Sequence, residues 1–247
     1  MIKSLIITVL LSGLLFAEDI YATFTVNADR EANLVLSSTG IVNKVYVDVG
    51  DTVKQGDLLL ELKNRDIFHS VKLARKKIEL AELNLKYAKK AYDRFSKVKD
   101  FVDAEKYDQY LSSYERAKIE LSKAEVNLQY KQAVFAKTKL KAPFSGVISH
   151  KYVESGDGVS GAKMATLFTL ITPNKQTLEI FIDEKYYKKL KLGQTFTFTL
   201  DGSSEKLTAK VTKIHPAIYT KKRAVMLEVE TTGIKVGLFG HGYLKVN

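Results

Sequence analysis

The longest regular pattern of apolar residues lies between Asn64 and Lys141, a stretch that contains neither Gly nor Pro. Apolar side chains recur there at alternating spacings of three and four, which is typical of a coiled-coil seam. The break near Lys99 to Val102 leaves room only for a tight turn, so the pattern predicts an antiparallel hairpin of two helices, each roughly 50 Å long. The seam residues are Val71, Ala74, Ile78, Ala81, Leu85, Ala88, Tyr92 and Phe95, then Tyr107, Tyr110, Tyr114, Ala117, Leu121, Ala124, Leu128 and Phe135, with Lys131 as the single interruption.

A repeated β pattern flanks this helical stretch. Residues 40–53 and 146–159 both read Gly, nine residues, then Gly-Asp-x-Val. Each copy begins with alternating apolar residues, closes on a Gly-Asp turn where a positive φ is easily adopted, and is followed by a second apolar strand at residues 57–62 or 164–171. A single β-hairpin cannot bury its face alone, so we expect the two copies to pack together as a small sandwich.

The last third of the chain alternates apolar and polar residues in short runs. Residues 177–182, 195–200, 207–214 and 225–229 each read as a half-buried strand.

The N-terminus has the order of a signal peptide. Lys3 precedes an apolar run from Leu5 to Phe16, which is followed by Ala17. The run is too short to span a bilayer comfortably, so we predict cleavage near Ala17. Two alternatives stay open, a retained anchor and a buried helix, because Leu15 is larger than the residue a signal peptidase prefers three positions before its cut.

Composition narrows the possible chemistry. The 247 residues carry a formal charge of +11, but the 39 Lys and Arg are spread along the chain and accompany no nucleic-acid-binding motif, so we expect no nucleic-acid partner. The chain has no Cys, which excludes disulfides, thiolate metal sites and a Cys nucleophile. The four His residues show no ligand spacing, and no nucleophile, base and orienting group come together. We therefore expect no catalysis, no cofactor and no bound metal.

Three local matches to known motifs are weaker than they look. Gly156, Gly158 and Gly161 fit the dinucleotide fingerprint, but too few residues follow before Pro173 for a crossover helix. The same stretch also resembles a phosphate-binding loop, but Lys163 comes one position too late and Met164 stands where that motif has Ser or Thr. Lys63 stands near the place where a lipoyl domain presents its modified lysine, but there the predicted helical hairpin replaces the exposed turn that a lipoyl carrier needs.

The chain resembles the periplasmic adaptor family, also called membrane fusion proteins, with HlyD-like adaptors of resistance-nodulation-division tripartite efflux pumps as members. The resemblance rests on a lipoyl-like motif split by a long α-hairpin and on residues 141–147, which read Lys-Ala-Pro-Phe-Ser-Gly-Val where the chain re-enters the β-domain. Residues 190–194 and 237–246 are similar to parts of the family's β-barrel.

This resemblance implies a multidomain α+β fold: a split lipoyl-like β-sandwich with an inserted antiparallel α-helical coiled-coil hairpin, followed by a small β-barrel. A membrane-proximal domain is expected to be reduced or absent, since the sequence stops on the barrel. The expected boundaries are a signal peptide at 1–17, an N-terminal β segment at 18–36 that belongs to the barrel or supplies a membrane-proximal part, lipoyl-like halves at 37–63 and 139–174, the hairpin at 64–138 and the barrel at 175–247.

The resemblance also implies a function. Members connect an inner-membrane transporter, here most simply a proton-driven one of the resistance-nodulation-division type, with a TolC-like outer-membrane channel, and they export drugs, toxic compounds or metal ions. They self-associate as trimer or hexamer rings in the periplasm, at the inner membrane. An ABC-type exporter as partner, or a cell-envelope coiled-coil scaffold without a transport role, remains an alternative.

Family members contact the outer-membrane channel through the tip of the hairpin. The positions that match the family's pattern are Arg94, Phe95, Val98, Val102 and Asp103. The spacing is two residues shorter than the family's, and Asp103 stands where the family has Ser. Asp103 could still cap the second helix while Arg94 and the apolar residues face the partner. In the alternative interpretation Arg94 is only solvated, and Phe95 and Val98 simply end the seam.

Overall fold

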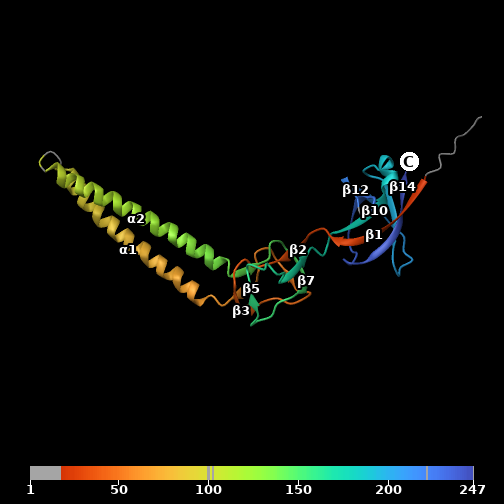
Figure 1. Cartoon of the computed structure of the whole chain (residues 1–247), viewed down its shortest axis with the longest axis horizontal. Helices are drawn as coiled ribbons and strands as arrows, with labels where there is room; N and C mark the ends of the chain where they lie inside the picture. The colour runs from red at the N-terminus through yellow and green to blue at the C-terminus, as the bar shows by residue number, and fades with distance from the viewer. Residues whose placement is uncertain (1–17, 99–100, 102, 221, 247) are drawn as a thin grey trace, which may run out of the picture. The chain divides into compact units, whose positions relative to one another are not determined.

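The computed structural model describes residues 18–98, 101, 103–220 and 222–246. They form two compact units (Figure 1). One unit runs from Ala32 to Leu170 and contains a β-sandwich and a helical hairpin, and the other combines the residues up to Glu31 with those from Ile171 onward.

The sandwich consists of two four-stranded sheets whose core lies between them. Its largest fully buried side chains include Leu59, Ile148 and Phe168, which come from both sides of the helical insertion. In spatial order, one sheet contains β2 (Glu31–Leu34), β9 (Phe168–Ile171), β7 (Gly146–Lys151) and β4 (Thr52–Val53), and the other contains β6 (Lys139–Lys141), β5 (Leu58–Leu62), β3 (Gly40–Val45) and β8 (Gly158–Val159).

The two sequence repeats are interleaved in this sandwich. The opening Gly of each repeat pairs with the closing Val of the other, Gly40 with Val159 and Gly146 with Val53. Gly50 adopts a φ of +92° and the equivalent glycine of the second repeat a φ of +99°, a region that costs glycine little. Each repeat thus contributes strands to both sheets, and neither could form its sheet alone.

The helical hairpin leaves the sandwich after β5 and returns to it at β6 (Figure 1). Its helices are α1 (Arg65–Ser96) and α2 (Ala104–Ala136). At the base, the amide of Asn64 donates to the hydroxyl of Thr138 at 3.0 Å, and Thr138 is almost fully buried. The predicted seam residues are the less exposed positions of both helices, while Leu73 and Leu80 on the outer side of α1 are mostly exposed.

The second unit is a closed six-stranded antiparallel barrel. Its interior is filled by apolar side chains from alternating positions, such as Phe24 and Phe198, whose rings meet edge to face at 5.2 Å. Strand β1 lies between β10 and β14, so the N-terminal strand closes the barrel. The strands in spatial order are β1 (Glu18–Ala28), β10 (Gln176–Asp183), β13 (Ala224–Thr231), β12 (Leu207–Tyr219), β11 (Thr195–Leu200) and β14 (Phe239–Val246).

The predicted fold class is confirmed, with a split sandwich, an inserted antiparallel hairpin and a small barrel. All strands in the described part of the chain belong to the sandwich or the barrel. No helix among the described residues combines the length and the apolar character needed to cross a membrane. The predicted signal peptide lies outside the described residues.

Candidate docking tip of the helical hairpin

Aromatic side chains hold the two helices together near the tip. Fully buried seam residues occur only toward the sandwich, where α1 contributes Val71, Ala74 and Ala81. Toward the tip, the half-buried ring of Phe95 stacks on that of Tyr110, with centroids 3.8 Å apart and planes at 15°. Offset-stacked rings contribute about 0.5–1.5 kcal/mol beyond the area they bury. Phe95 therefore joins α1 to α2, and its ring packs between the two helices of the hairpin rather than facing outward.

A second aromatic group lies one turn further from the tip. The rings of Tyr92 and Tyr114 are stacked at 5.4 Å, and the hydroxyl groups of Tyr92 and Tyr107 lie 3.2 Å apart. The hydrogen bond with Tyr107 raises the pKa of Tyr92, which stays neutral at physiological pH. These contacts join the helices across the seam and stiffen the end of the hairpin.

Among the described residues of the tip, Phe101 has the most exposed large apolar side chain, at 90%. Its backbone N–H donates to the carbonyl of Val98 at 2.9 Å, and Val98 is itself 42% exposed. Phe101 was not among the predicted contact residues. The sequence did contain a signal for it, because an aromatic residue between the two seams, out of their register, has no helix face on which to be buried.

Asp103 caps the second helix, as its residue type predicts. It is the N-cap of α2, and its carboxylate accepts a hydrogen bond from the backbone N–H of Glu105 at 3.0 Å. The cap fixes where α2 starts. Val102, the remaining predicted contact residue, lies outside the described residues.

Arg94 is exposed in the last turn of α1. A positive charge there is favourable because the helix dipole is negative at its C-terminus. One turn earlier, Lys89 and Asp93 form an ion pair at 2.7 Å, and this hydrogen bond raises the pKa of Lys89. Among its described residues the tip therefore presents an exposed guanidinium, Arg94, and two exposed apolar side chains, Val98 and Phe101, which are residue types suited to packing against other helices.

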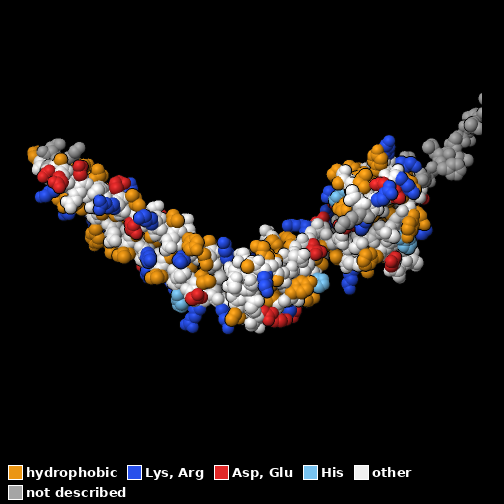
Figure 2. All heavy atoms as spheres, in the orientation of Figure 1, with side chains coloured by type: hydrophobic (Ala, Val, Ile, Leu, Met, Phe, Trp, Pro, Cys, Tyr) orange, Lys and Arg blue, Asp and Glu red, His pale blue; other side chains and the backbone are white. Residues whose placement is uncertain are grey.

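Among the described residues, no group of three or more His, Asp and Glu side chains could hold a metal ion. The glycine triplet that resembles a dinucleotide fingerprint lies in the sandwich, where Gly158 belongs to β8 and the following segment is a turn. Lys and Arg side chains are scattered over the visible face of the hairpin and alternate with carboxylates (Figure 2).

A sandwich of interleaved repeats, a hairpin inserted between them and a closed barrel together define the membrane fusion, or periplasmic adaptor, class of proteins. Residues 30–171, more than half of the chain, match the family model described as CzcB-like, barrel-sandwich hybrid domain. The chain belongs to this family, and the predicted resemblance is confirmed.

Among curated proteins, the chain is similar to the cobalt-zinc-cadmium resistance protein CzcB of Cupriavidus metallidurans, with 24% identity over 215 residues. The match covers 83% of this chain and 40% of CzcB, so the chain spans less than half of that relative. Among solved structures, MacA from Actinobacillus actinomycetemcomitans has a TM-score of 0.76 at 21% identity, covering 94% of this chain and 79% of MacA. ZneB from Cupriavidus metallidurans has a TM-score of 0.59 at 17% identity, with coverages of 94% and 99%. Both structures share the fold.

Proposed function

We propose that this protein is the periplasmic adaptor of a tripartite efflux pump, joining an inner-membrane transporter to a TolC-like outer-membrane channel. The observation that carries the proposal is the stiff hairpin with an exposed apolar and basic tip, built on a fold that belongs to the adaptor family. Such a tip has no use inside a single chain, and helix-on-helix docking gives it one.

The proposed contact with the channel is made by Arg94, Val98, Phe101 and the start of α2 at Asp103, with Val102 between them in the chain. Phe101 supplies the largest apolar area and Arg94 a donor for carboxylates or carbonyl oxygens. Phe95 acts indirectly in this proposal, because its stacking on Tyr110 keeps the end of α1 in place.

The remaining parts of the proposal follow from the family. The protein is not an enzyme. It forms a trimer or hexamer ring in the periplasm at the inner membrane, after cleavage near Ala17 or with the N-terminal segment kept as an anchor. The transporter is of the proton-driven resistance-nodulation-division type. Drugs, toxic compounds and metal ions are the cargo classes, and the printed name of CzcB makes cobalt, zinc and cadmium ions the first to test.

An accumulation assay in cells tests the efflux role. Cells with the gene deleted, complemented with the wild type, or complemented with Arg94→Asp plus Phe101→Ala are loaded with a fluorescent efflux substrate, or with zinc, cobalt or cadmium ions. We expect deletion to raise accumulation of at least one substrate and the tip variant to behave like the deletion. Unchanged accumulation of every substrate in the deletion strain would contradict the efflux role.

A matched variant separates the tip from the hairpin as a whole. Arg116→Asp plus Tyr130→Ala reverses a charge and removes an exposed ring on α2, away from the tip. We expect this variant to restore efflux at wild-type expression. If it fails as the tip variant does, the tip assignment is wrong even where the efflux role holds.

The energy source distinguishes the two transporter classes. Collapsing the proton gradient with a protonophore while ATP is maintained should abolish the adaptor-dependent efflux of a proton-driven pump. Efflux that survives the protonophore and stops on ATP depletion would indicate the ABC-type alternative.

A further inference from the structure

The first and last described residues, Glu18 and Val246, lie at the same end of the barrel. The backbone of Glu18, the first residue of β1, pairs with that of Val246, and Asp183 at the end of β10 pairs with Ala224 at the start of β13. The short 3-10 helix η2 (Glu184–Lys189) follows β10 at this end, where β12 also ends at Tyr219 and β13 begins at Ala224.

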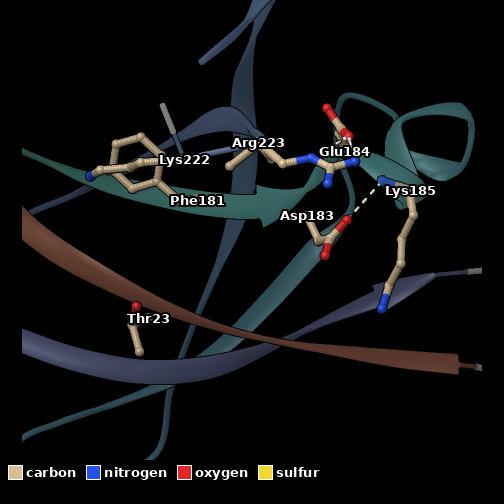
Figure 3. A pocket seen from close by; sticks show the side chains of 8 residues that line it. Thr23, Phe181, Asp183, Glu184, Lys185, Lys222 and Arg223 are labelled. Atoms are coloured by element: carbon tan, nitrogen blue, oxygen red, sulfur yellow. Dashed lines mark hydrogen bonds and ion pairs between the residues drawn. The ribbon is translucent and has the colours of Figure 1, made fainter. Parts of the chain in front are cut away.

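This end is strongly basic. We call its Lys and Arg side chains the basic rim, and all of them are exposed. The same end carries four carboxylic residues, Glu18, Asp19, Asp183 and Glu184, and Glu184 pairs with Arg223 at 2.5 Å (Figure 3). The seven Lys and Arg side chains outnumber them, so the net charge of this end is positive. The basic rim consists of Lys185, Lys188, Lys189, Lys191, Lys222, Arg223 and Lys245.

Large apolar side chains are exposed among these charges. Tyr187 is 54% exposed, Leu192 is 66% exposed and Tyr219 is 42% exposed. Tyrosine rings at the edge of a basic surface are typical of segments that lie at the boundary between headgroups and water, where Lys and Arg reach the phosphates.

Three residues of the rim, Lys185, Lys222 and Arg223, line an open hollow of about 800 Å³ together with the carboxylates of Asp183 and Glu184. The ammonium group of Lys222 lies 3.6 Å from the centre of the Phe181 ring, and Phe181 meets Tyr219 edge to face at 5.7 Å. Figure 3 shows Lys222 and Phe181 on one side of the hollow and Lys185 on the other.

We propose that the basic rim docks on a bilayer surface that contains anionic phospholipids. β1 begins at this end with Glu18, and the apolar run from Leu5 to Phe16 comes shortly before it in the sequence, which favours a membrane over a protein as the occupant. The rim is a second attachment that does not need the N-terminal segment, and stable anchoring usually takes two such signals. The inference rests on the proposed position at the inner membrane.

Vesicle co-sedimentation tests the docking without any transport step. The chain from Glu18 onward, which keeps every described element and lacks the apolar run, is mixed with vesicles of phosphatidylcholine alone or with 30% phosphatidylglycerol. Each Lys near an anionic surface adds about fivefold to binding, so we expect Lys185→Ala plus Lys222→Ala to weaken it at least about tenfold. The charge-matched control is Lys206→Ala plus Lys235→Ala, which lie at the opposite end of the barrel.

Binding that requires phosphatidylglycerol, falls with salt, and is lost in the rim variant but kept in the control supports the proposal. Absence of binding, equal binding to neutral vesicles, or equal loss in both variants overturns it. If the rim variant abolishes efflux in cells while the wild type ignores vesicles, the rim meets a protein instead, and the lipid proposal fails while the adaptor role stands.

Discussion

The stacked pair at the end of the hairpin gives the sharpest test of how the tip is built. In Phe95→Ala, the tip loses a half-buried ring that lies 3.8 Å from Tyr110. Replacing a fully buried Phe by Ala costs about 3–5 kcal/mol, and the Phe95 ring keeps part of its surface in water, so we expect a smaller loss of about 2 kcal/mol in the local opening free energy. About 1 kcal/mol of this loss belongs to the stacked pair itself.

Native-state hydrogen exchange measures this local opening free energy directly. Amides at residues 90–96 and 104–112 should exchange about thirtyfold faster in Phe95→Ala, since each 1.4 kcal/mol is a factor of ten. Exchange in the sandwich should not change. In a double-mutant cycle with Tyr110→Ala, the combined loss should be about 1 kcal/mol smaller than the sum of the single losses.

Leu83→Ala is the matched control, because Leu83 is an apolar residue on the same helix that is already 46% exposed. Its effect on the tip amides should be within about 0.5 kcal/mol. If Phe95→Ala leaves the exchange rates of the tip unchanged, or if its effect adds fully to that of Tyr110→Ala, the two rings do not hold the helices together.

Three further changes test other parts of the fold. Gly161→Ala places a Cβ 2.0 Å from a backbone carbonyl oxygen, so it should lower the free energy of unfolding, measured by denaturant titration, by about 2 kcal/mol or more. Gly158→Ala is the control, because a Cβ at that position meets open space. Equal effects of the two substitutions would refute the close approach at Gly161. Asp103→Ala should cost about 1 kcal/mol, seen as about fivefold faster exchange in the first turn of α2, and unchanged exchange would show that the cap stabilises nothing. Burial tends to raise the pKa of Glu228, but hydrogen bonds from His215 and a neighbouring lysine outweigh it and lower the pKa. The ionised Glu228 therefore stabilises the folded state above the ordinary carboxyl pKa of 4.5, and this stabilisation is lost as the pH falls through the lower pKa of the folded state. The difference in unfolding free energy between wild type and Glu228→Gln should shrink as the pH is lowered. A difference that stays constant from pH 7 to 3 would contradict this.

The parts of the fold that the sequence predicts are those set by local periodicity. The seam from Val71 to Phe95 follows the helix repeat, and the structure gives those positions less exposure than their neighbours. The two Gly-Asp turns mark equivalent hairpins, since only a turn with a positive φ closes them at low cost. The interleaving of the two repeats is harder to predict from the sequence, because the pairing of Gly40 with Val159 joins residues on either side of the whole helical insertion.

The closure of the barrel is also set by long-range strand pairing that local periodicity does not predict. The sequence left residues 18–36 open between the barrel and a membrane-proximal part, whereas the structure pairs β1 with β10 and β14, more than a hundred residues away. No periodicity within β1 specifies those neighbours. At the tip, the seam pattern gives Phe95 an inward position that suits its stacking on Tyr110, whereas the family's motif groups it with the contact residues. Neither seam includes Phe101, so the helix repeat does not predict its exposed position.

Site-specific photo-crosslinking in intact cells tests the central claim most directly. A photoreactive phenylalanine analogue replaces Phe101 in one strain and Tyr130, a 61% exposed ring away from the tip, in another. The account predicts that position 101 yields a product containing an outer-membrane channel, that position 130 does not, and that the product disappears when the channel gene is deleted. Equal crosslinking from both positions, or no channel product from position 101 in cells that still export, would contradict docking through the hairpin tip.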